Sequence, residues 1–234
     1  MREILRFVTD SEPCPYLRDR RARLLYRMIP ALEKAQYSRE LDRGFRRFGI
    51  GVFRPVCESC AECVPLRLRI EALRPTRSQR RALIRSQDLD VEVGEPSFSD
   101  EKLDLYHRFH AQRTRARGWP TARLTESEYR ETFVVNAAPT LEVQYRLEGT
   151  LVAVAYAGEA DDALNAIYAY HDPDHARRSL GTLNVLRLCE EGRRRAKTFV
   201  YLGYRVKGCP SMEYKASFRP HEIRGEDGVW REGS

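Results

Sequence analysis

Aromatic and cationic side chains alternate along the segment YLGYRVKGCPSMEYKASFRP, residues 201–220. The segment contains three tyrosines, one phenylalanine, two lysines and two arginines. Rings interleaved with cations are typical of a surface that binds flat groups, anionic groups or both. The candidate site residues in this segment are Tyr201, Tyr204, Tyr214, Lys215, Phe218 and Arg219.

Four cysteines form a second candidate site. Cys57, Cys60 and Cys63 recur at steps of three in CESCAEC, and Cys14 in EPCPYL is the candidate fourth ligand. Thiolates at this spacing on a short turn can bind one zinc ion or one iron–sulfur cluster. The pattern is less regular than a complete pair of C-x2-C motifs, so buried or incidental thiols remain the alternative. Cys189, on an apolar helix face, is expected in the core.

Arginines crowd the segment RPTRSQRRALIRSQ, residues 74–87. Pro75 can start a helix, and steps of four then place three of the arginines on one face. Like charges at this spacing repel, so the stripe costs stability unless an anion binds to it. We therefore favour phosphate binding over a merely solvated face. The candidate phosphate-binding residues are Arg77, Arg80, Arg81 and Arg85.

The segment HDPDHARRSLGT, residues 171–182, combines a strand end with a helix start. Ser179 is the expected N-cap, and Gly181 in the first turn lets a ligand approach the backbone. Arg177 and Arg178 add positive charge at the positive end of the helix dipole. The alternative is a plain strand–loop–helix connection with a surface arginine pair.

Composition and charge narrow the class of protein. The chain has 234 residues, 42% of them hydrophobic and 32% charged, as in globular proteins, and its net charge is +7. That charge suits a polyanionic partner such as nucleic acid, although a solvated arginine-rich surface explains it equally well. No apolar run approaches the roughly 20 residues that span a bilayer. The N-terminus lacks a signal sequence, so we expect a cytoplasmic protein with reduced thiols and no membrane partner.

Hydrophobic periodicity predicts the order of elements. A helix is expected over residues 99–117, capped by Ser99 and stopped by Gly118, and a second opens at the capping box of Thr125 and Glu128. A hairpin follows, with strands at 141–147 and 150–157 around the turn at Glu148 and Gly149. A strand at 163–170, a helix from 179 and a strand at 198–204 complete the order, and residues 64–70 alternate as a strand.

This order is that of a GNAT-type acyltransferase. We predict an α/β (α+β) fold with a GNAT-like domain at residues 97–234. An N-terminal subdomain at residues 1–96 would carry the cysteines and the arginine-rich helix.

Several motifs together resemble the arginyltransferase family of aminoacyl-tRNA–protein transferases, in particular its bacterial leucyltransferase branch. They are CPYL, RGFRRFG, FRPVCESCAECVPLRLRI, RPTRSQRR, LEVQYRL, DPD followed by SLGT, and the closing aromatic and cationic segment. The resemblance implies transfer of an amino acid, leucine in that branch, from tRNA to the N-terminal Asp or Glu of acceptor proteins. Such a transfer marks the acceptor for degradation. Arginyl-tRNA as the donor stays open.

Transfer of this kind is aminolysis of an ester, which needs no strong base. An α-amine has a pKa of about 7.7–8.0, so positioning and stabilisation of an oxyanion can supply most of the rate. We expect the four arginines of residues 77–85, with Arg177 and Arg178, to hold tRNA phosphates. Either Lys215 or Arg219 would pair with the acceptor's acidic side chain. Aromatic residues, Tyr168 included, would shape the pocket for the terminal adenosine or the aminoacyl group.

The candidate residues divide into three sets. The catalytic set is Tyr201, Tyr204, Lys215 and Arg219. The substrate-binding set is Arg77, Arg80, Arg81, Arg85, Tyr168, Arg178, Ser179, Gly181, Tyr214 and Phe218. The metal set is Cys14, Cys57, Cys60 and Cys63, holding an iron–sulfur cluster or zinc, while the transfer itself is expected to require no cofactor.

Two functions of other classes compete with this interpretation. A small-molecule N-acyltransferase of the GNAT type would use an acyl thioester, and it would need a pyrophosphate loop richer in glycine than RRSLGT. A non-enzymatic RNA-binding protein would bind RNA with a steep salt dependence and transfer no amino acid.

Overall fold

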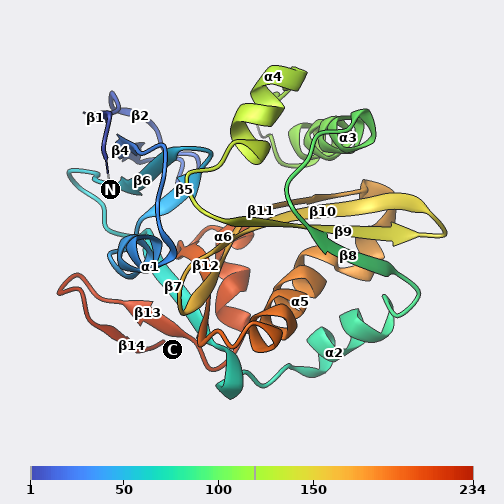
Figure 1. The fold of residues 1–234 in the computed structure, drawn as a ribbon. Coiled ribbons are helices and arrows are strands. Elements are labelled where there is room, and N and C mark those ends of the chain that lie inside the picture. Colours follow the sequence, from blue (N-terminus) through green and yellow to red (C-terminus); the bar gives the residue numbers. More distant parts are fainter. Residues whose placement is uncertain (1, 119, 234) are drawn as a thin grey trace.

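A computed structural model describes residues 2–118 and 120–233 of the chain (Figure 1). Its N-terminal elements are β1 (Leu5–Val8), β2 (Glu12–Pro13), β3 (Arg21–Ala22), β4 (Leu24–Met28), α1 (Lys34–Asp42), β5 (Arg46–Phe48), β6 (Gly51–Pro55), β7 (Val64–Arg69), the 3₁₀ turn η1 (Ile70–Ala72), α2 (Arg77–Ile84) and β8 (Asp90–Gly94). The remaining elements are α3 (Asp100–Arg117), α4 (Glu126–Tyr129), the π-helical η2 (Arg130–Val134), β9 (Thr140–Leu147), β10 (Thr150–Glu159), β11 (Ala163–His171), η3 (Pro173–Arg178), α5 (Leu180–Arg194), β12 (Phe199–Arg205), α6 (Pro210–Glu213), η4 (Tyr214–Ser217), β13 (Glu222–Arg224) and β14 (Trp230–Glu232).

An eight-stranded sheet in the order β14-β13-β7-β12-β11-β10-β9-β8 organises the molecule. Helices α3 and α4 lie on one side of it, and α5 with α2 lies on the other (Figure 1). Strand β10 runs between the two layers and is buried along almost its whole length, as its apolar sequence predicts. The main core forms between the sheet and α5, where Leu180, Leu183 and Leu186 are buried beside Cys189, whose burial was predicted.

Strand pairing confirms the α/β class and the acyltransferase-type order of elements. Strands β9, β10 and β11 pair antiparallel, and β11 continues through α5 into a parallel partner, β12. In the described residues β11 and β12 pair only from Ala163 with Phe199 to Asn165 with Tyr201. Both strands run on beyond these pairs, so they part at one end.

Local capping confirms most predicted helix boundaries. The Ser99 side chain accepts a hydrogen bond from the Lys102 amide, and Gly118 ends α3 in the left-handed conformation. Thr125 forms the predicted capping box with Glu128. Ser179 takes the predicted N-cap position of α5, although its φ is +57° and its side chain makes no capping hydrogen bond.

A second, four-stranded sheet forms from β1, β4, β6 and β5 and packs its buried side against α1. The sequence patterns did not predict β1 to β4 or α1. Strand β7 pairs with β12 and β13 in the large sheet, and its alternation buries Leu66 and Leu68 as predicted. The proposed division of the chain at residues 96 and 97 stays a prediction.

The described helices include none with both the length and the apolar character that crossing a membrane requires.

Candidate functional site

The place where β11 and β12 part is filled by Arg46 of β5. Its Nη2 donates a hydrogen bond to the main-chain oxygen of Ala166 at 2.5 Å. On the other strand, a Cβ atom added to Gly203 would lie 2.6 Å from the Arg46 guanidinium, and the φ of Gly203 is +81°. Only glycine combines that backbone conformation with so close an approach. The guanidinium therefore bridges the two strands at their parting.

Lys215 belongs to η4, and its side chain reaches β12 close to Gly203. Its Nζ donates a hydrogen bond to the main-chain oxygen of Tyr204 at 2.9 Å and lies 3.6 Å from Met212 Sδ. Burial of the ammonium, and then the charge of Arg46, lower the pKa of Lys215 to about 7. Burial also lowers the pKa of Arg46. A lysine of this kind changes its protonation near neutral pH.

The two tyrosines of β12 belong to different clusters. The Tyr204 hydroxyl donates to the main-chain oxygen of Gly44 at 2.8 Å, within a small cluster that also contains Cys209. The Tyr201 hydroxyl accepts from Arg67 at 3.0 Å, in the cluster beside α1. Burial raises the pKa of both phenols, that of Tyr201 to about 12. The Tyr204 hydroxyl proton is thus used in a bond to the main chain, whereas the Tyr201 hydroxyl accepts a bond from Arg67, and a catalytic role for either tyrosine stays a prediction.

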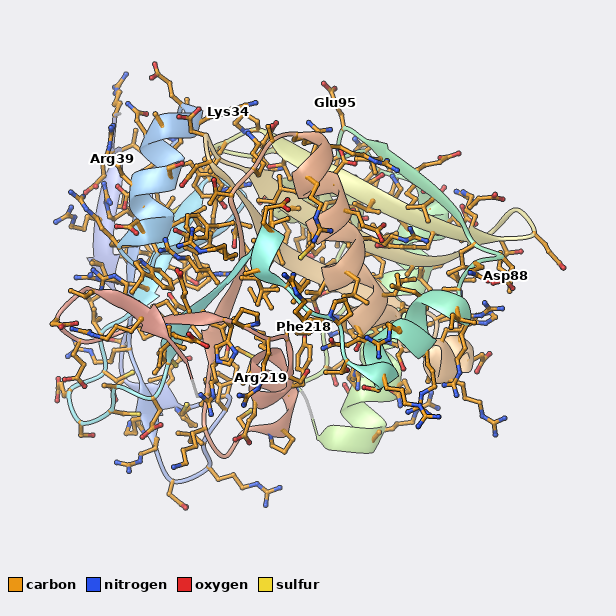
Figure 2. The ribbon with its side chains drawn as sticks, turned by 90° about the horizontal axis from the view of Figure 1, so that it is seen from below. Lys34, Arg39, Asp88, Glu95, Phe218 and Arg219 are labelled. Carbon is orange, nitrogen blue, oxygen red and sulfur yellow. The ribbon has the colours of Figure 1, made fainter. Side chains whose placement is uncertain are left out.

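The end of the predicted segment divides between surface and core (Figure 2). Arg219 is exposed, and its main-chain oxygen accepts from the Arg74 amide at 2.8 Å. Phe218 is fully buried in the main core, while Tyr214 is 43% exposed. The structure therefore brings Lys215 together with Tyr204, leaves Arg219 and Tyr214 at the surface, and uses Phe218 for packing.

The arginines of α2 form an exposed band that links this segment to the start of α5. Near the beginning of α2, Gln79 Nε2 donates to the main-chain oxygen of Ser217 at 3.2 Å. At its end, Arg85 donates to the main-chain oxygen of Arg177 at 3.1 Å. The four arginines of the band are all exposed: Arg77, Arg80, Arg81 and Arg85. A continuous positive surface on one helix suits a chain of phosphates.

Arg178 differs from this band because its charge is already paired. Its two terminal nitrogens contact the two carboxylate oxygens of Asp88 at 2.6 and 2.9 Å, and it also donates to the main-chain oxygen of Arg85. Arg178 thus ties η3 to the end of α2. Its predicted contact with a phosphate would have to compete with this bidentate pair.

The remaining predicted substrate residues lie at two different places. A Cβ atom added to Gly181 would meet no atom within 4 Å, so the start of α5 is open at this point, and Ser179 beside it is exposed. Tyr168 is on the α3 side of the sheet, with its hydroxyl 2.8 Å from His110 Nε2. Ser179 and Gly181 thus adjoin the arginine band, whereas Tyr168 belongs to the aromatic cluster beside α3.

The four cysteines of the metal set are all free and half-buried. Burial first, and then the neighbouring thiols of Cys14, Cys57 and Cys60, raise the pKa of Cys63 to about 12. Across residues 2–118 and 120–233, no three His, Cys, Asp or Glu side chains are arranged as metal ligands. Metal binding stays a prediction that rests on ligand type and on the spacing of the cysteines in the sequence.

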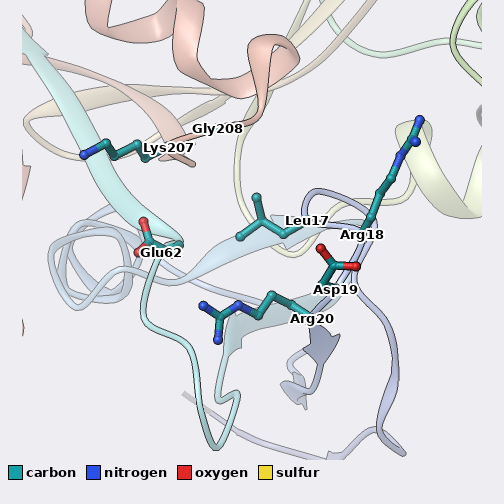
Figure 3. Close-up of a pocket in the computed structure, with 7 residues that line it drawn as sticks. All are labelled: Leu17, Arg18, Asp19, Arg20, Glu62, Lys207 and Gly208. Atoms are coloured by element: carbon teal, nitrogen blue, oxygen red, sulfur yellow. The ribbon is translucent and has the colours of Figure 1, made fainter.

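A cavity of about 340 Å³ opens beside the cysteine segment (Figure 3). Its lining comes from the loop at residues 17–20, from the cysteine turn and from the loop that follows β12: Leu17, Arg18, Asp19, Arg20, Glu62, Lys207 and Gly208. Positive and negative side chains share its walls. Leu17 packs against the cluster that contains Tyr204, so the cavity borders the Lys215 region.

Sequence reasoning missed Arg46. Its segment, RGFRRFG, contributed to the family resemblance, but neither of its central arginines was taken as a site residue. Arg46 owes its position to the place where β11 and β12 separate. This separation is a tertiary feature, and no local sequence pattern predicts it.

Known families and curated relatives match nearly the whole chain. A family model described as "Arginine-tRNA-protein transferase, N terminus" matches residues 12–81, and one described as "Arginine-tRNA-protein transferase, C terminus" matches residues 101–225. An aspartate/glutamate leucyltransferase of Marinobacter nauticus is 38% identical over 236 residues, covering 100% of this chain and 98% of the relative. One of Pseudomonas entomophila is 37% identical over 222 residues, covering 93% and 92%.

Similar solved structures include FemX, with a TM-score of 0.46 at 8% identity over 79% of this chain and 75% of that one. The structure of L-PGS from Bacillus licheniformis gives a TM-score of 0.46 at 12% identity over 73% and 58%.

Proposed function

Because the chain belongs to the arginine-tRNA-protein transferase family, we propose that it transfers leucine from leucyl-tRNA to an N-terminal Asp or Glu. The chain is an aminoacyl-tRNA–protein transferase, and its curated relatives of nearly equal length are named aspartate/glutamate leucyltransferases. The added leucine would mark the acceptor for degradation in the cytoplasm.

One observation supports this function best. The exposed arginine band of α2 is joined through Ser217 to the segment that carries the half-buried ammonium of Lys215. The arginine band, which suits a polyanion, thus neighbours Lys215, which suits a small anion. An enzyme that joins a nucleic-acid donor to an acidic peptide needs both.

The reaction needs positioning more than it needs acid–base chemistry. The acceptor's α-amine attacks the ester carbonyl carbon, a C–N bond forms, the C–O bond to the terminal ribose breaks, and the amine's proton passes to the ribose oxygen. Near pH 7 a useful fraction of α-amine is already neutral, since its pKa is about 7.7–8.0. Holding the amine against the ester can therefore supply much of the rate.

Lys215 suits the recognition of the acidic side chain better than Arg219 does. An enclosed cation interacts more strongly with a carboxylate than an exposed one, because water screens the exposed charge. Arg219, on the outer surface beside α2, is placed to extend the phosphate-binding band. The open backbone at Gly181 is the place for the donor's 3′ end.

The cysteines have the ligand type for zinc or an iron–sulfur cluster, and they come from the loop at Cys14 and from the turn at 57–63. A bound metal would crosslink these two segments and stabilise the wall of the cavity at Glu62. Lys215 and the arginine band carry out their proposed roles without it.

The direct test is a donor and acceptor panel. Purified enzyme is incubated with leucyl-tRNA or arginyl-tRNA and with peptides that begin with Asp, Glu or Ala, and labelled amino acid in the peptide is measured. We expect leucine on the Asp and Glu peptides and none on the Ala peptide. Transfer from arginyl-tRNA alone, or no transfer at all, would overturn the proposal.

A further inference from the structure

Arg46 holds a hydrogen-bond donor that the protein leaves unused. Its Nη2 is bound to Ala166, but Nη1 is buried and has no acceptor in residues 2–118 and 120–233. A buried donor without a partner costs free energy comparable to a lost hydrogen bond. Such a group next to a parting between two strands indicates that something else supplies the acceptor.

The charge of Arg46 is also unmatched. The largest electrostatic influences on it come from Tyr204, Tyr37, Tyr16 and Arg47, none of which is a carboxylate. The ammonium of Lys215 lies close enough to Arg46 for the positive charge of Arg46 to lower the pKa of Lys215. Among the described residues neither cation forms an ion pair with Asp or Glu. Two neighbouring cationic groups shielded from water and without a counter-ion are unfavourable.

Other buried cations of this protein are compensated. Arg27 pairs with Glu40 at 2.8 Å and with Glu3 at 2.6 Å, and Lys102 pairs with Glu142. Arg47, the sequence neighbour of Arg46, donates to the oxygens of Gly49, Asn136 and Thr140. Arg46 and Lys215 thus lack the carboxylate partners of Arg27 and Lys102 and the several oxygen partners of Arg47.

We infer that Arg46 and Lys215 form the site that receives the carboxylate of the acceptor's N-terminal Asp or Glu. This inference rests on the transfer reaction proposed above. Nη1 of Arg46 would donate to one carboxylate oxygen, and the Lys215 ammonium would provide the second positive contact. The acidic residue then completes the hydrogen bonds and the charge balance of the site, which gives selectivity over a neutral residue.

The surroundings favour a peptide end over an RNA phosphate. The lining of the cavity beside this cluster combines three cations, Arg18, Arg20 and Lys207, with the carboxylates of Asp19 and Glu62. A peptide end that has both an acidic side chain and a protonated α-amine matches both signs of charge, whereas a phosphodiester has no positive group to pair with the two carboxylates. They would attract the positive form of a peptide's α-amine as it arrives. A phosphodiester also carries a ribose on each side, whereas an acidic side chain reaches inward on a short, narrow stem.

The test replaces the guanidinium and measures selectivity. For the wild type and Arg46→Gln, kcat/KM is determined with saturating leucyl-tRNA and peptides that begin with Asp or with Asn. We expect Arg46→Gln to lower the preference for Asp at least tenfold, through a higher KM for the Asp peptide. Arg46→Lys keeps the positive charge but loses the planar guanidinium with its several N–H donors. Its preference for Asp should therefore lie between that of the wild type and that of Arg46→Gln. Arg39→Gln, the same change at an exposed position of α1, should keep the wild-type preference.

The outcomes separate this inference from the proposed function. If the wild type transfers no leucine to the Asp peptide, the function fails and the site falls with it. If the wild type is selective and both Arg46 variants keep its full preference, the function stands and the inference is wrong.

Equal losses of kcat/KM for both peptides, together with a lower melting temperature, would show that Arg46 has a structural role only. A loss of tRNA affinity with unchanged preference would assign the site to a phosphate. Arg46→Lys decides the matter if Arg46→Gln does not fold.

Discussion

Lys215 Nζ donates a hydrogen bond to the main-chain oxygen of Tyr204 at 2.9 Å. This bond attaches the η4 turn to β12 and buries the ammonium near Arg46. Burial, followed by the charge of Arg46, lowers the pKa of Lys215 to about 7. The lysine therefore changes charge in the pH range in which the acceptor's α-amine does so too.

The pH dependence of transfer follows from these two groups. The reaction needs a neutral α-amine, which raises kcat/KM with pH, and a protonated Lys215, which is lost above about pH 7. For the wild type and the Asp peptide we expect a bell-shaped profile. Lys215→Arg stays charged throughout, so its profile should lack the fall on the alkaline side. A wild-type profile that keeps rising to pH 9 would contradict the proposed role of Lys215.

The same lysine makes stability depend on pH. Its pKa is about 7 in the folded protein and near its ordinary value of 10.5 in the unfolded chain. Below pH 7 both states are protonated and the burial penalty is fully present. As pH rises from about 7 to 10 the unfolded chain binds more protons than the folded protein, so the free energy of unfolding increases.

Lys215→Met removes this dependence. We expect the variant to be more stable than the wild type at pH 6.5, by a few kcal/mol at most, and the difference to shrink by pH 9.5. Urea unfolding at several pH values measures it. Two curves that stay parallel over this range would show that the ammonium is not buried in the folded protein.

Local patterns in the sequence predicted the elements whose boundaries are set by neighbouring residues. The hairpin turn at Glu148 and Gly149 has the positive φ values, 50° and 82°, that such a turn requires. The caps at Ser99 and Thr125 act within three residues of themselves. These signals are complete in a short window, so no knowledge of the tertiary structure was needed.

The site depends on tertiary placement that local patterns do not contain. Arg46 and Arg47 are adjacent on β5, so their side chains point to opposite sides of the strand. One then meets Asn136 and Thr140, and the other meets the parting of β11 and β12. Nothing in the dipeptide distinguishes the two. Phe218 likewise has an aromatic ring that could bind a ligand, but the ring packs in the same buried cluster as α5 and is part of the core.

The arginine band of α2 should determine the salt dependence of tRNA binding. The double variant Arg77→Gln and Arg81→Gln removes two exposed charges one turn apart. We expect weaker binding, and a slope of log K against log salt that is smaller by about 0.7–0.9 for each phosphate that the variant no longer neutralises. Filter binding of leucyl-tRNA at several salt concentrations measures this slope.

A matched control lies on α1 and at its end, where Arg39 and Arg43 are exposed at the same spacing. Changing both to Gln makes the same net-charge difference on another part of the surface and should leave the slope unchanged. If the two double variants reduce binding equally, the effect is one of overall charge, and the band on α2 has no special role.

The cysteine set is tested by metal content. Protein purified without oxygen is expected to contain zinc or iron, and Cys60→Ser should reduce the metal-to-protein ratio because it removes a ligand. Cys189→Ala is the control, since this thiol is 1% exposed in the main core and should change stability without changing metal content. Metal-free wild-type protein with full transfer activity would refute a metal site.

The substitution Gly181→Ala distinguishes a role of this residue in folding from a role in binding leucyl-tRNA. A methyl group added there meets no atom within 4 Å, and alanine is favoured over glycine in a helix by about 0.5–1 kcal/mol. Gly181→Ala should therefore raise the melting temperature slightly. If the 3′ end of the tRNA approaches the backbone at this turn, the same methyl group blocks it, and KM for leucyl-tRNA should rise severalfold while KM for the peptide does not. A more stable variant with an unchanged KM for leucyl-tRNA would place the donor elsewhere, because the methyl group then occupies space that the substrate does not use.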